Sequence, residues 1–101
     1  MLSKEVRINR YGGHTWRIEL GGHYRLALHE HGEGGFTVEL LEWKWVNHAT
    51  RFRYDHNADL TSVVRKAFAR AAEYLGSGGY IAFDIQSHEE RMRIVLEHLN
   101  K

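Results

Sequence analysis

The chain has 101 residues, 43% of them apolar and 27% charged, which is ordinary for one globular domain over residues 1–101. Its 14 basic and 13 acidic residues leave a formal charge of +1, which argues against binding to nucleic acid through net charge alone. The chain has no cysteine, so disulfides and thiolate zinc sites are excluded.

Glycine marks the turns of this chain, because there is no proline and all ten glycines fall in four clusters. Between the first three clusters, apolar and polar residues alternate with a period of two, which is typical of half-buried strands. The predicted strands cover residues 5–9, 15–20, 24–29 and 36–40.

Two glycine loops set the predicted register, since a slip of one residue would turn the apolar side chains toward solvent. A loop at residues 21–23 pairs Ile18 with Leu26. A loop at residues 11–13 pairs Ile18 with Val6 on its other side. We therefore predict a three-residue hairpin loop with a glycine bulge at both places.

A second hairpin, residues 41–54, is rich in aromatic residues. The alternation slips at Leu40-Leu41, which indicates a β-bulge. A turn near residues 47–50 would return the chain and bring two tryptophans against two aromatic residues of the next strand. The predicted pairs are Trp43 with Tyr54 and Trp45 with Phe52.

Residues 59–76 have the pattern of an amphipathic helix. Asp59 is a suitable N-cap, and Gly76 is a suitable stop at the other end. The apolar residues between them recur with the helical period and predict one buried stripe. This stripe consists of Leu60, Val64, Ala67, Phe68, Ala71 and Leu75.

Residues 80–85 have the composition of a short strand, and a second helix follows. Ser87 is its predicted N-cap, and Glu90 would complete a capping box. The predicted core residues of this helix are Met92, Val95, Leu96 and Leu99.

These elements predict an α+β fold: an antiparallel β-meander of about five strands, then helix, short strand, helix. Both helices need an apolar surface, so we expect both on one face of the sheet. The opposite face should be hydrated. No apolar stretch suits a signal peptide or a membrane span, so the sequence predicts a cytoplasmic protein without membrane contact.

The sequence contains no recognisable catalytic motif, so we expect a non-enzymatic protein that needs no cofactor. Its predicted role is that of a small regulator, inhibitor or adaptor that binds another protein through the polar sheet face or the 41–54 hairpin. Tryptophan and arginine are enriched at such interfaces. The candidate contact residues are Arg17, Arg25, Trp43, Trp45, Arg51 and Arg53. An open edge strand would also permit a homodimer.

Two alternatives stay open. The first is a nucleic-acid-binding protein with a basic patch on the first helix and the 51–53 strand, formed by Arg51, Arg53, Arg65, Lys66 and Arg70. The second is a metal-binding protein, because the chain has eight histidines and two of them alternate along one strand. These two are His29 and His31.

Overall fold

The computed structural model describes residues 2–5, 11–78 and 82–99. Five strands come first in the chain: β1 (Leu2–Glu5), β2 (Gly12–Gly21), β3 (Tyr24–His31), β4 (Phe36–Lys44) and β5 (Asn47–His56). Two helices follow, α1 (Leu60–Ser77) and α2 (Ile85–Leu99). The strands form an antiparallel meander in the order β1-β2-β3-β4-β5. An α+β fold with a meander followed by helices is therefore confirmed.

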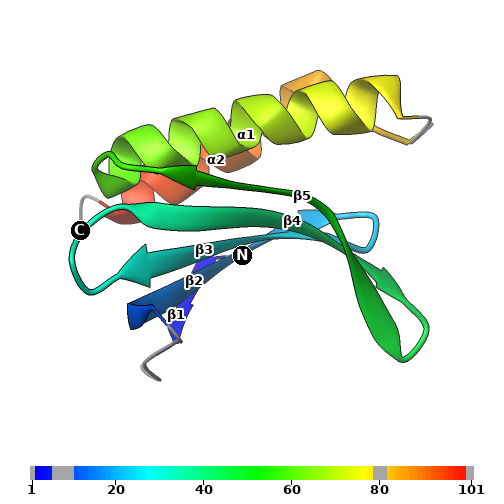
Figure 1. Ribbon diagram of the computed structural model, residues 1–101. Coiled ribbons are helices and arrows are strands. Elements are labelled where there is room, and N and C mark those ends of the chain that lie inside the picture. Colours follow the sequence, from blue (N-terminus) through cyan, green and yellow to red (C-terminus); the bar gives the residue numbers. More distant parts are fainter. Residues whose placement is uncertain (1, 6–10, 79–81, 100–101) are drawn as a thin grey trace.

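Both helices lie on the same side of the sheet, as Figure 1 shows. The reason is the period-two pattern, which places the apolar side chains of the central strands on one face. Leu26, Leu28, Val38 and Leu40 are fully buried there, together with Phe68 of α1. The helix stripe is buried much as its periodicity predicts. Its buried members are Val63, Val64, Ala67, Phe68, Ala71 and Leu75.

The predicted register of β2 and β3 is confirmed, with Ile18 opposite Leu26. The loop differs from the prediction. Gly22 and His23 form a two-residue turn in which both residues have positive φ, 57° and 72°, as a type I′ turn requires. The extra residue lies instead in a register shift of β2 between Glu19 and Gly21.

The predicted three-residue loop at residues 11–13 is wrong. Ile18 pairs with Leu2 rather than with Val6, which lies outside the described residues, and Gly12 already belongs to β2. Glycine is needed here for close backbone approach: a Cβ on Gly13 would lie 2.0 Å from the carbonyl oxygen of Glu30.

The predicted register of the second hairpin is also wrong. Its turn is at residues 45–46 rather than 47–50, so Trp43 pairs with His48. The predicted bulge near Leu41 exists, but the additional residue is Arg51 on the facing strand. The aromatic residues of β5 consequently lie opposite aliphatic residues of β4 and pack toward the core. The observed pairs are Phe52 with Leu40 and Tyr54 with Val38.

Of the predictions made around the helix termini, one is confirmed and another is wrong. Asp59 caps α1 and accepts a hydrogen bond from the Ser62 amide at 2.8 Å. The predicted strand at residues 80–85 is not formed in its described part, because 82–84 are irregular and Ile85 already begins α2. Asp84 accepts hydrogen bonds from the backbone and side chain of Ser87, so Asp84 occupies the capping position predicted for Ser87.

Phe68 provides a test of this packing, since it is 1% exposed between the sheet and α2. We expect Phe68→Ala to lower the free energy of unfolding by about 3–5 kcal/mol, the usual cost of a large cavity in a packed core. Arg65→Ala, which shortens an exposed side chain one turn earlier, should change it by less than about 0.5 kcal/mol. Urea denaturation followed by circular dichroism measures both, and equal effects of the two substitutions would contradict the assigned core.

Candidate functional site

The hairpin of β4 and β5 extends beyond the other strands. β3 begins at Tyr24, which lies opposite Glu42, and the Trp43 amide donates the next hydrogen bond to the His23 carbonyl at 2.8 Å. Residues further along the hairpin pair only with each other in the described chain. Figure 1 shows this end of β4 and β5 bending away from the helices. We call residues 43–48 the hairpin tip.

The hairpin tip presents large apolar side chains to solvent. Trp45 is 100% exposed, Val46 is 88% exposed and Trp43 is 39% exposed. Single exposed apolar residues are common on protein surfaces, but three within four residues form a cluster. This cluster distinguishes the tip from the remainder of the described surface, where Ile85 is the other large hydrophobic side chain of this kind.

Trp45 also has a strained backbone. Its φ is 59°, in the left-handed region that glycine and asparagine occupy at hairpin turns. For a residue with a Cβ this conformation costs about 1 kcal/mol or more. The most exposed aromatic residue therefore occupies the position where the turn itself would favour a small residue.

The base of the hairpin tip is held by charged and aromatic contacts. The Arg25 guanidinium lies 5.3 Å from the Trp43 ring and donates to Glu19 at 2.5 Å. The His48 ring packs edge-to-face against Trp43, with centroids 5.3 Å apart. A hollow beside this cluster is lined by His23, Trp43, Lys44 and Trp45.

On the other face of the hairpin, the bulged Arg51 forms an ion pair with Glu42. The shortest contact, from Arg51 Nη2 to Glu42 Oε1, is 2.6 Å, and both side chains are about three-quarters covered. Partial burial alone would raise the pKa of Glu42, but the hydrogen bond and charge of Arg51 outweigh it and hold that pKa below its usual value. This pair connects the bulged residue of β5 to the facing strand β4.

The polar face of the sheet contains the two candidate metal ligands. His29 Nε2 lies 2.6 Å from a Glu39 carboxylate oxygen, and its Nδ1 lies 3.2 Å from the Thr15 hydroxyl. The two histidines therefore belong to a network of side chains on β2, β3, β4 and β5. Each imidazole has its own partners.

His31 is part of a chain of hydrogen bonds that crosses β4. The Thr37 hydroxyl donates its single proton to Asp55 at 2.6 Å, so it must accept from His31 Nε2, 2.8 Å away. The Nε2 atoms of His29 and His31 thus point to different acceptors. Within residues 11–78 and 82–99, no three His, Cys, Asp or Glu side chains are grouped so that they could hold a metal ion.

Tyr11 covers part of this polar face, which was expected to be hydrated. Its ring stacks on His31 with centroids 4.6 Å apart, and its hydroxyl accepts a hydrogen bond from Arg53 on the far strand β5. Thr37 and Ala27 on this face are 1% and 3% exposed. The expectation of a fully hydrated face is therefore wrong at its centre, because the side chain of Tyr11, a turn residue, lies over His31 and reaches Arg53.

The candidate basic residues do not form one patch. Lys66 and Arg70 lie over the Tyr54 ring, each 5.1 Å from its centroid, on the helix side of β5. Arg53 is on the opposite face, as alternation along a strand requires. Arg51 is bound to Glu42, and Arg65 faces α2. Arg17 of the protein-binding set lies on the polar face, opposite Ala27.

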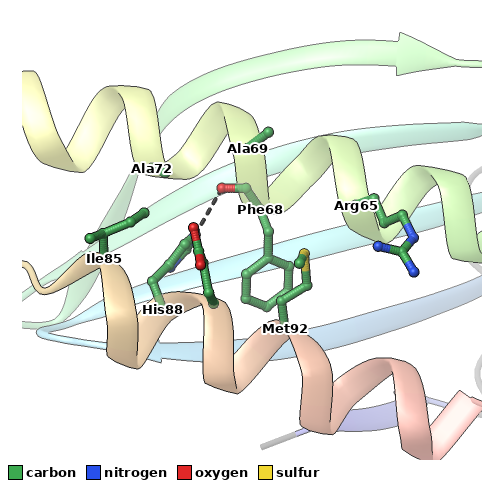
Figure 2. A pocket seen from close by; sticks show the side chains of 8 residues that line it. Arg65, Phe68, Ala69, Ala72, Ile85, His88 and Met92 are labelled. Atoms are coloured by element: carbon green, nitrogen blue, oxygen red, sulfur yellow. Dashed lines mark hydrogen bonds between the residues drawn. The ribbon is translucent and has the colours of Figure 1, made fainter.

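A small apolar cavity of about 200 Å³ lies between α1 and α2. Figure 2 shows Phe68 of α1 and Met92 of α2 close together between Ile85 at one end and Arg65 at the other. His88 lies beneath it, 4% exposed, and its Nε2 donates to the Phe68 carbonyl oxygen at 2.8 Å. His88 is therefore a buried polar residue that takes part in the packing between α1 and α2.

Comparison with known proteins finds no matching protein family, no matching curated protein and no matching solved structure. In the described part of the chain, no helix has the length and apolar character needed to cross a membrane.

His88 predicts a dependence of stability on pH. Burial lowers its pKa in the folded chain, although the Phe68 carbonyl acts in the opposite direction. Below about pH 6.5, the ordinary histidine pKa, the unfolded chain therefore takes up this proton first and the free energy of unfolding decreases. Above that pH the contribution of neutral His88 is complete. We expect His88→Gln to flatten this decrease.

The comparison requires urea denaturation of both proteins between about pH 7.5 and pH 5, since the chain has eight histidines and only the difference between the two curves reports on His88. His98→Gln, which alters an exposed histidine of the same helix, is the matched control and should keep the wild-type slope. If His88→Gln and the wild type have parallel stability curves, the buried imidazole does not control this slope.

Proposed function

We propose that this chain is a small non-enzymatic protein-binding domain, a regulator, inhibitor or adaptor, whose hairpin tip inserts into an apolar depression of its partner. The observation that carries the proposal is Trp45, which is fully exposed at a strained left-handed turn position. Strain of this kind persists where the surrounding structure enforces it, and it is concentrated at functional sites.

The chemistry of the hairpin tip suits a protein partner. Trp45, Val46 and Trp43 provide apolar area, and Arg25 provides a charge at the rim. Tryptophan and arginine dominate binding hot spots, where one side chain contributes about 2 kcal/mol or more. The two-residue turn and the Arg51–Glu42 pair hold the tip in position, so that little conformational entropy is lost on binding.

The polar face supports a structural role for its histidines within this proposal. His29 and His31 each use Nε2 to contact a neighbour on β4, and both networks end at carboxylates of the same sheet. Satisfied networks of this type make a polar surface rigid. We therefore assign partner recognition to the hairpin tip and sheet rigidity to the histidines.

Trp45→Gly tests the proposal, because it removes the side chain and also relieves the turn. We expect partner affinity to decrease by about 30-fold or more, as for a hot-spot residue. The free energy of unfolding should stay unchanged or increase by up to about 1 kcal/mol, since relief of the left-handed strain offsets the greater backbone entropy of glycine.

The measurement is affinity capture from a lysate of the source organism, with mass spectrometry, followed by thermal denaturation of each bait. Ile85→Ser is the matched control, since it removes an exposed apolar side chain from α2 rather than from the hairpin tip. A wild-type bait that retains no specific protein, or a Trp45→Gly bait that retains the same protein equally well, would contradict the proposal.

A further inference from the structure

We propose that the outer edge of β5 binds an acidic, extended segment of the partner, which adds to the sheet as another strand. This inference rests on the proposed function, because β5 is continuous with the hairpin tip and a partner at the tip would lie beside this edge. The inference adds which chemical groups the partner should present to β5. We call residues 51–55 together with Lys66 and Arg70 the β5 edge.

The β5 edge is open to pairing. β5 is a terminal strand of the sheet, with β4 on one side, and it spans the ten residues Asn47–His56. Figure 1 shows it as the outermost strand beside α1. A terminal strand presents backbone N–H and C=O groups without a strand partner, and an extended peptide can satisfy both kinds of group.

Cations lie on both faces of the β5 edge. Lys66 and Arg70 rest on the Tyr54 ring on the helix side, and Arg70 is also 5.9 Å from the Phe52 ring. Arg53 lies on the other side and donates to the neutral hydroxyl of Tyr11. Among the described residues, none of these three cations forms an ion pair with a carboxylate.

Asp55 is the acidic residue within the β5 edge, and its hydrogen bond to a neutral hydroxyl leaves its charge in place, so the three cations face one carboxylate. Asp55 accepts from the Thr37 hydroxyl, Glu42 binds Arg51, and Glu73 follows Arg70 on α1. Burial raises the pKa of Tyr54 to about 12, so its phenol adds no negative charge. The β5 edge therefore has an excess of positive charge close to open backbone groups.

Strand geometry connects these two features. Side chains of an added strand alternate between the two faces of the sheet. Acidic residues that point toward α1 would reach Lys66 and Arg70, and those that point away would reach Arg53. A second copy of this chain would instead bring the same cations together, so self-pairing through β5 is disfavoured. A nucleic acid could neutralise the cations, but its phosphates could not donate hydrogen bonds to the carbonyls of this edge, whereas a peptide strand can.

The test is an NMR titration of the isotope-labelled full chain with a synthetic peptide of about eight residues, a usual strand length, in which glutamate and valine alternate. Amide signals of residues 51–55 should shift. The variant Lys66→Glu, Arg70→Glu should weaken peptide binding by about tenfold or more, because two attractions become repulsions. The variant Lys66→Gln, Arg70→Gln should lose less affinity for the peptide. It replaces the glutamate variant in this test if that variant unfolds.

The matched control is Arg65→Glu, Arg93→Glu, which makes the same change in net charge away from β5 and should bind the peptide as the wild type does. A peptide with lysine in place of glutamate and a glutamate–valine peptide with methylated backbone nitrogens should not shift the β5 amides. Equal binding of the methylated peptide, shifts confined to other elements, or shifts caused by oligothymidine but not by the peptide would each overturn the inference.

These experiments can refute either proposal without refuting the other. If the wild type captures its partner through Trp45 but the acidic peptide leaves residues 51–55 unchanged, the β5 inference is wrong and the hairpin tip stands. If the peptide binds β5 but Trp45→Gly captures the partner normally, the hairpin tip is wrong and the edge stands.

Discussion

The structure depends on one constraint: the central strands turn all their large apolar side chains to the same face. Ile18, Leu26, Val38 and Leu40 are fully buried there, and α1 and α2 can cover that face but no other. The opposite face must then be stabilised without a hydrophobic layer. Its histidines, threonines and carboxylates do this by bonding across strands, with Tyr11 lying over them.

The same constraint determines which part of the protein is exposed and able to contact a partner. Because the pairing with β3 ends at Tyr24, the end of the β4–β5 hairpin extends beyond the other strands and bends away from the helices (Figure 1). The bulge at Arg51 allows β5 to keep Phe52 against the core while the tip turns outward. Exposed tryptophans, a strained turn and a positively charged open edge thus occur on one hairpin. The proposed protein recognition rests on these features.

Much of the fold could be predicted from the sequence, and the errors have a common cause. Alternation gave β2 to β4 and the pair Ile18–Leu26, and helical periodicity with the Asp59 cap gave α1. Glycine was the ambiguous signal: it predicted a turn at 11–13, where the structure uses Gly13 for close approach to β3. The hairpin turn was missed for the converse reason, since Trp45-Val46 has none of the residues that mark a turn.

By itself the sequence determined the α+β class, the meander, the apolar stripe of α1 and the candidate residues Trp43 and Trp45, because these follow from local periodicity and composition. Tertiary structure decided which of the candidates lie together. It separated Arg53 from Lys66 and Arg70 by the thickness of the sheet, gave His29 and His31 different partners, and placed Trp45 at the turn. Register is the physical reason, since one bulge or one residue of loop length changes the neighbours of every side chain in a strand.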